Sequence, residues 1–216
     1  MPYPYNDTGH VIYGWGDSGG ITPHPSDGHF YVAMNNRMAV GLQSNGTCVM
    51  RTASLLDPRS WRAWDGTGFN VELVSAYTLP PGERPAHVCS VLEPFMSTPC
   101  TVYGTAWSAY LGAFVATLSC WHDAQPGPND PRFYWATSPD FVHWSEPQVL
   151  YDPPAEPHTQ FYLYPALLDA AAPARGDANY ATLGQTATLT FVRVTDNFYT
   201  EGRQVLGVNV SFSGGG

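Results

Sequence analysis

The sequence contains no lysine, and its nine basic residues are all arginine, against 18 aspartates and glutamates. A formal net charge of -9 repels a phosphate backbone or an anionic lipid surface. No apolar run approaches the roughly 20 residues of a membrane-spanning helix, and Met1 to Pro4 lack the features of a signal peptide. We therefore expect no nucleic-acid partner, no membrane association and a soluble chain without an export signal.

Cysteine is also scarce, with four residues at Cys48, Cys89, Cys100 and Cys120. An even number allows two bridges in a secreted context, so the compartment stays open. His87 with Cys89, and Cys120 with His122, could each share one face of a strand and hold zinc, but the spacing is not a standard zinc motif. We expect a Cys89–Cys120 disulfide or buried thiols instead, and neither a metal nor another cofactor.

Turn-forming and aromatic residues are abundant: 21 glycines, 20 prolines and 14% aromatics. This composition is typical of many short strands joined by tight turns. An internal repeat supports that interpretation, because Phe30–Met34 is echoed by Ala113–Thr117, and Trp61 by Trp144, both 83 positions later. Two segments that keep one spacing indicate a duplicated supersecondary unit.

Each unit is predicted to contain four strands. The first two units are read as an inner strand (Gly20–His24; Val88–Leu92), a second strand (Phe30–Met34; Ala113–Leu118), a third (Gly46–Thr52; Phe133–Ser138) and a fourth that begins after the tryptophan. A third unit covers Phe161–Leu168, Ala187–Val194 and Gln204–Val210. Repeated four-stranded antiparallel sheets predict an all-β propeller, and three blades fall short of the four to eight that close a ring. We expect one partial propeller domain over 1–212 and a flexible tail over 213–216.

Several motifs resemble the five-bladed β-propellers of glycoside hydrolase families 43 and 32. Ala136 to Ser145 (ATSPDFVHWS) is similar to their blade signature, and Ser26 to Tyr31 (SDGHFY) to the turn between their first two strands. Thr47–Thr52 and Asp57–Gly66 look closer still to a group of bacterial propeller proteins related to these hydrolases. The resemblance is specific for fold and weak for chemistry, since one fold hosts many functions.

The resemblance implies catalytic carboxylates where innermost strands enter a central funnel. Asp17, flanked by glycines, is the first candidate, and the alternative is a turn aspartate bonded to its own backbone. Glu93 is the second candidate. The third unit departs from the family pattern, because no carboxylate lies between Glu156 and Asp169.

Glycan contacts are expected from residues near the same strand ends, because aromatic rings offer a flat apolar platform with a polar edge. The candidates for substrate binding are Trp15, His87, His158, Tyr162 and Tyr164. The pentapeptide around Ser18 (GDSGG) also matches the nucleophile motif of chymotrypsin-like proteases, but only His10 precedes it, so the required order of triad residues fails.

We therefore expect a carbohydrate-active propeller, either a glycoside hydrolase or an inactive relative. The alternative is a non-catalytic module for glycan binding or assembly. An open arc of three blades would expose two apolar sheet faces, which predicts a homodimer.

Overall fold

A computed structural model describes residues 15–36, 43–74, 87–95, 100–120, 131–156, 158–177, 179–195 and 202–213, with only the backbone described for 15–18 and 160. This part of the chain is all-β apart from short 3-10 turns, of which η2 (Pro173–Arg175) is described in full. Among the described residues, no helix is long and apolar enough to cross a membrane.

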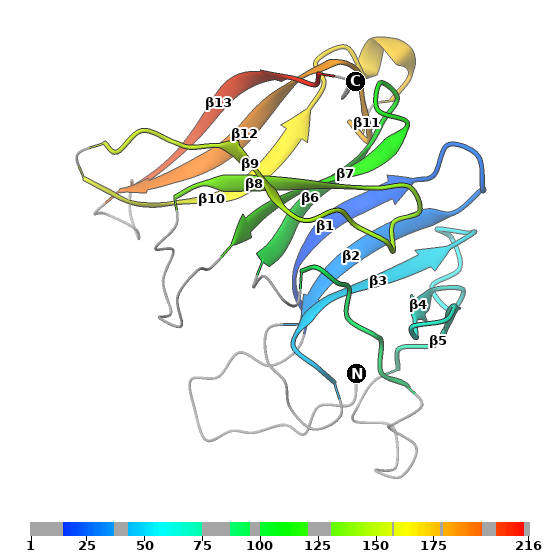
Figure 1. Cartoon of the computed structure of the whole chain (residues 1–216). Coiled ribbons are helices and arrows are strands. Elements are labelled where there is room, and N and C mark those ends of the chain that lie inside the picture. Colours follow the sequence, from blue (N-terminus) through cyan, green and yellow to red (C-terminus); the bar gives the residue numbers. More distant parts are fainter. Residues whose placement is uncertain are drawn as a thin grey trace, which may run out of the picture.

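The strands form three sheets (Figure 1). The first sheet is an antiparallel meander of β1 (Trp15–Pro23), β2 (Phe30–Asn36), β3 (Gly46–Thr52), β4 (Arg62–Trp64) and β5 (Phe69–Val71). The second contains β6 (Cys100–Ser108), β7 (Ala113–Cys120), β8 (Phe133–Ser138) and β9 (Gln148–Tyr151), with β11 (Thr182–Leu183) parallel to β6. The third joins β10 (Thr159–Leu168), β12 (Thr186–Thr195) and β13 (Arg203–Ser211).

The second sheet lies between the other two. The sequence of its strand β7 is almost continuously apolar because both faces of the strand are buried. Phe114 and Ala116 pack on one face with Tyr31 and Ala33 of the first sheet. Val115 packs on the opposite face with Leu189 and other residues of the third sheet. A strand that is buried on both faces loses the alternation of a half-buried strand. The two interfaces hold the three sheets together.

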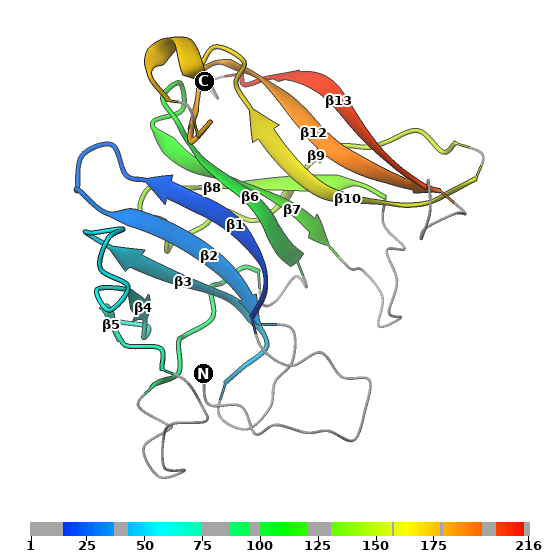
Figure 2. The same ribbon diagram turned by 180° about the vertical axis from the view of Figure 1, so that it is seen from behind.

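The first strands of the three sheets, β1, β6 and β10, lie side by side (Figures 1 and 2). The Thr22 and Thr105 hydroxyls lie 2.8 Å apart and link β1 to β6. The Thr117 hydroxyl donates to the Pro165 carbonyl oxygen at 2.7 Å and links the second sheet to β10. The sheets therefore converge on these three strands.

Most predicted strands are confirmed, two of them with the predicted bounds (Gly46–Thr52 and Phe133–Ser138). The inner strand predicted at Val88–Leu92 is wrong, since β6 begins the second sheet at Cys100. Residues 88–92 instead run beside the first sheet, where Leu92 N–H donates to the Thr47 carbonyl oxygen at 2.7 Å. Four-stranded blades are not confirmed either, because in the described part of the chain the three sheets hold five, five and three strands.

The disulfide prediction is wrong as well. Cys48 is bonded to Cys89, and Cys100 to Cys120, so Cys89 and Cys120 belong to different bridges. Cys100 and Cys120 are register partners in the β6–β7 hairpin, which brings their side chains together. The other bridge fastens the 87–92 segment to β3.

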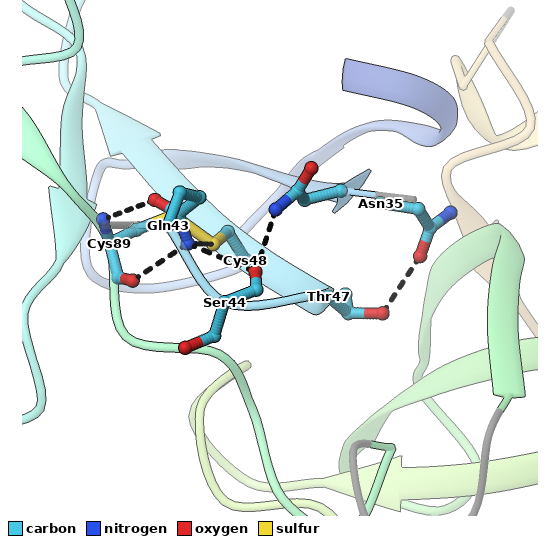
Figure 3. Close-up of a disulfide and its surroundings, with 7 residues drawn as sticks. Asn35, Gln43, Ser44, Thr47, Cys48 and Cys89 are labelled. Carbon is cyan, nitrogen blue, oxygen red and sulfur yellow. Dashed lines mark hydrogen bonds between the residues drawn. A yellow bond between two sulfur atoms is a disulfide. The ribbon is translucent and has the colours of Figure 1, made fainter. Parts of the chain in front are cut away.

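The buried amide of Gln43 supports the Cys48–Cys89 bridge (Figure 3). Its Nε2 donates to the Cys89 carbonyl oxygen at 3.1 Å, and its Oε1 accepts from Cys89 N–H at 3.0 Å. Nearby, the Thr47 hydroxyl donates to the Asn35 side-chain oxygen at 2.8 Å (Figure 3). The side chains of Gln43, Asn35 and Thr47 are thus paired, as most buried polar groups are.

The outward face of the third sheet differs from the apolar surface that a dimer was expected to use. Ala187, Leu189 and Phe191 face the second sheet, so the alternate residues of β12 and their partners on β13 face away. These outward residues are Thr188, Thr190, Val192, Val205, Gly207 and Asn209. Val205 is 77% exposed, but most of the others are polar or lack a side chain. On β10 the same face carries Leu163, which is the register partner of Val192, so Leu163, Val192 and Val205 form one apolar row and the premise of an apolar terminal face is met only in part at this sheet.

Candidate functional site

A cavity of about 560 Å³ lies where β1, β6 and β10 meet. Each of these first strands supplies part of the wall, through Gly19–Ile21, Tyr103–Ala106 and Ala166–Leu168. The rest of the lining includes Asp177 and Asn179–Ala181, from the loop between β10 and β11. The cavity is thus formed by strands that are far apart in the sequence.

All three first strands are irregular beside this cavity. The register of β1 shifts at Asp17 and again at Gly19 and Gly20. The register of β6 shifts at Tyr103. The register of β10 shifts at Tyr164 and Pro165. β-Bulges redirect side chains and leave backbone groups outside the ladder of hydrogen bonds. The wall therefore contains backbone as well as side chains.

Two glycines permit the close approach of the first strands. A Cβ atom at Gly19 would lie 2.9 Å from Thr105 Cγ2. A Cβ atom at Gly104 would lie 2.7 Å from Thr117 Oγ1 and 3.2 Å from the Pro165 carbonyl oxygen. Side chains at these positions would separate the strands that line the cavity.

The loop between β10 and β11 is held over the cavity by Asp169, which is 5% exposed. Its Oδ2 accepts from Arg175 at 2.7 Å and from Gly184 N–H at 2.8 Å. Burial by itself raises the pKa of Asp169, but the hydrogen bonds from Arg175, Ala171 and Gly184 outweigh burial and lower it. The carboxylate therefore stays ionised and fixes the loop.

Asp177 has a similar role within the same loop. Its Oδ2 accepts from Thr182 N–H and from the Thr182 hydroxyl, both at 2.6 Å. Burial raises the pKa of Asp177, but these bonds and those from backbone N–H groups outweigh burial and lower it. A general acid must hold a proton near its working pH, so Asp177 is poorly suited to that role.

The cavity offers aromatic and apolar surface from several directions. Tyr103 and Tyr180 line it, together with Phe30, Ile21 and Leu55. The ring of Tyr164 meets that of Tyr103 edge to face, with centroids 5.5 Å apart. Ile21 and Leu55 are about half exposed, so part of this apolar surface is open to solvent.

The predicted site residues are spread over several parts of the structure. Asp17 and Trp15 lie on β1, two and four positions before the lining residue Gly19, and their side chains lie outside the described part. Tyr164 is 43% exposed beside Tyr103. Tyr162 is buried in the core between the second and third sheets, with its hydroxyl donating to the Pro154 carbonyl oxygen at 2.9 Å.

None of the predicted site residues is among the described lining residues of this cavity. Glu93 lines a second hollow of about 350 Å³, with Trp64, Trp144, His143 and Glu146. His87 Nδ1 donates to the Glu72 carbonyl oxygen at 2.6 Å. His158 is an exposed residue just before β10, with a positive φ of 62°. The structure therefore does not bring Glu93 and His87 into the cavity beside β1.

Sequence reasoning missed Tyr103, Asp177 and Tyr180. Tyr103 follows Gly20 by 83 positions, the spacing of the internal repeat, so extending that repeat to the first strands would have found it. No sequence signal placed Asp177 and Tyr180 at the cavity, because the loop reaches it only through pairing of β11 with β6. In the described part of the chain, no three metal-ligating side chains gather into a cluster.

Comparison with known families and with curated proteins finds no match. Among solved structures, the chain is similar to an N-acetylgalactosamine deacetylase from F. plautii in complex with blood group B trisaccharide, at 15% identity and a TM-score of 0.47. That likeness covers 89% of this chain and 49% of the deacetylase chain, so this chain spans about half its length.

A second similar structure is a complex of BT0996 with RGII, at 9% identity and a TM-score of 0.34, covering 90% of this chain and 70% of that protein. Both TM-scores are below 0.5, so neither likeness identifies the activity of this chain. The resemblance to hydrolase families 43 and 32 stays a prediction.

Proposed function

We propose that this protein is a propeller-like arc of three sheets that binds a glycan in the cavity between its first strands. The observation that carries the proposal is the convergence of three bulged strands on one cavity that combines tyrosines with exposed backbone. The side-by-side arrangement of β1, β6 and β10 at the centre of the arc supports the propeller architecture.

The lining suits the two kinds of surface that a sugar presents. A sugar ring has an apolar face, for which Tyr103 and Tyr180 provide flat partners. It also has hydroxyl groups at its edge, which the Asn179 amide and the exposed backbone of Gly20 can meet. A cavity of this size is within the range of small-ligand sites.

Binding without hydrolysis fits the described lining better than catalysis. A glycosidase needs two carboxyl groups about 5 to 10 Å apart, one of which carries a proton. Asp177 is the one carboxylate among the described lining residues, and its lowered pKa keeps it ionised. Glu93 lines the other hollow.

Hydrolysis remains the second candidate because of the position of Asp17. It is the residue at which the register of β1 shifts, two positions before the cavity wall. A carboxylate in a bulge next to a ligand site is suitably placed for catalysis. It would still require a partner, either from a further blade or from a residue outside the described part.

The test combines a glycan array with an assay for new reducing ends. Binding without release of reducing ends supports the proposal, and release that Asp17→Asn abolishes while the melting temperature is unchanged supports a hydrolase. If no glycan binds and none is cleaved, both proposals are wrong. Tyr110→Ala, a change at an exposed tyrosine outside the lining, is the matched control.

A further inference from the structure

Two tyrosines have backbone conformations that tyrosine rarely adopts: Tyr180, which lines the cavity, and Tyr164, which lies beside the lining residue Tyr103. Tyr164 has φ 57° and Tyr180 has φ 55°, both in the left-handed region. A residue with a Cβ atom is strained there, and Tyr164 also precedes Pro165, which further restricts its backbone. Strain of this kind persists only where the surrounding structure imposes it, and it is concentrated at ligand sites.

Core packing does not account for these side chains. Tyr164 is 43% exposed and Tyr180 is 38% exposed, whereas the buried rings of this protein are below 10%. An exposed aromatic ring gains little from burial, so burial does not offset the backbone strain at these two positions. Glycine would suit either backbone position better, so the presence of tyrosine points to a use for the ring.

The bulges bring two of the tyrosines, Tyr103 and Tyr164, together. Tyr103 occupies the register shift of β6 and Tyr164 that of β10, and their rings meet edge to face at 5.5 Å. Tyr103 and Tyr180 both line the cavity. Tyr103 and Tyr180 therefore belong to the cavity wall, and Tyr164 lies against Tyr103 next to that wall.

The charge of the lining narrows the class of ligand. No arginine or histidine is present among the described lining residues, and the sequence has no lysine. Asp177 adds a negative charge to this wall. A uronate or sulfated sugar would thus be repelled by this wall and would have no cationic partner here. An uncharged sugar ring is not repelled and needs no such partner.

We propose that Tyr103, Tyr164 and Tyr180 form an aromatic platform that selects uncharged sugar rings, an inference that rests on the proposed glycan binding. Tyr103 supports the ring of Tyr164, and the strained backbones of Tyr164 and Tyr180 direct their rings toward the bound sugar.

The test uses Tyr164→Gly and Tyr180→Gly, because glycine removes the ring and relieves the strain together. We expect each variant to melt at the same temperature as the natural protein or higher, and to bind neutral oligosaccharides about tenfold more weakly. Tyr164→Phe and Tyr180→Phe keep the ring and should retain most of the affinity. Tyr110→Gly, at an exposed tyrosine outside the lining, should leave binding unchanged.

Calorimetric titration with neutral xylo-, cello- and manno-oligosaccharides, and with oligogalacturonate as the anionic probe, measures the affinities. Undiminished neutral binding by both glycine variants would overturn the platform while leaving the proposed function intact. Preference of the natural protein for oligogalacturonate would overturn the neutral class. Binding of none of these probes, together with an empty glycan array, would overturn the proposed function itself.

Discussion

Gly104 shows how one missing side chain sets the spacing of the sheets. A Cβ atom there would meet the Thr117 hydroxyl at 2.7 Å, along with the Pro165 carbonyl oxygen and the Ala166 Cα, both at 3.2 Å. Two of these contacts are backbone atoms of β10, which cannot rotate away as a side chain can. The Thr117 hydroxyl is itself needed, since it bonds to Pro165.

We expect Gly104→Ala to lower the free energy of unfolding by about 1–3 kcal/mol, the usual cost of overpacking. Urea denaturation measures the change. Ala109→Ser, which adds one atom at an exposed position just after β6, should have almost no effect. Equal stability of Gly104→Ala and the natural protein would show that β6 and β10 can separate without cost.

At the scale of elements, the β10–β11 loop depends on the ionised carboxylate of Asp169. Its pKa is lowered because hydrogen bonds from Arg175, Ala171 and Gly184 outweigh the effect of burial. The folded-state pKa is therefore below the unfolded value of about 3.9. The stabilisation is complete above that value and is lost as the pH falls through the folded-state pKa.

We expect Asp169→Asn to be less stable than the natural protein by about 1–3 kcal/mol at neutral pH. The difference should stay constant from about pH 8 to about pH 5 and shrink below about pH 4, because the natural carboxyl is then protonated as well. Denaturation at a series of pH values checks this. A difference that persists unchanged at pH 2 would mean that the charge of Asp169 is not what stabilises the loop.

The two disulfides stabilise different elements. One closes 41 positions between β3 and the 87–92 segment, and the other closes 20 positions within the β6–β7 hairpin. In the chain-entropy model, bridges over loops of these lengths each contribute about 3 to 4 kcal/mol, with the longer loop contributing more. Both also suit an oxidising compartment.

We expect the double variant Cys48→Ala/Cys89→Ala to lose more stability than Cys100→Ala/Cys120→Ala, by roughly 0.6 kcal/mol. Denaturation of the two variants gives the order, and peptide mapping of unreduced protein gives the pairing. A peptide pair joining Cys89 to Cys120 would contradict the structure.

For the whole molecule, the homodimer remains a prediction. A terminal sheet with a fully apolar outward face would have given it stronger support. The outward face of the third sheet is rich in threonine, and Val205 is its most exposed apolar side chain. We therefore expect self-association that depends on concentration, with Val205→Asp shifting it to the monomer. Light scattering across the micromolar range measures this, and a monomer at every concentration would contradict the prediction.

Strand positions within each sheet could be predicted from the sequence because they depend on local properties. Runs such as Gly46–Thr52 and Phe133–Ser138 combine β-branched and aromatic residues with turns that follow at once, and both strands have the predicted bounds. The 83-residue repeat relates β2 to β7, and the Thr22–Thr105 pair keeps the same spacing between β1 and β6. The all-β class therefore follows from the sequence alone.

The first strand of the second sheet, the disulfide pairing and the cavity were decided by tertiary structure. Val88–Leu92 has the composition of a strand, yet the Cys48–Cys89 bridge and bonds to the first sheet hold it elsewhere. Tyr103 meets Tyr164 only because bulged strands from different sheets meet, and Tyr180 shares the cavity with Tyr103 only because β11 pairs with β6. Local propensity determines where strands form, whereas contacts between residues far apart in the sequence determine which strands meet. The candidate site depends on these long-range contacts.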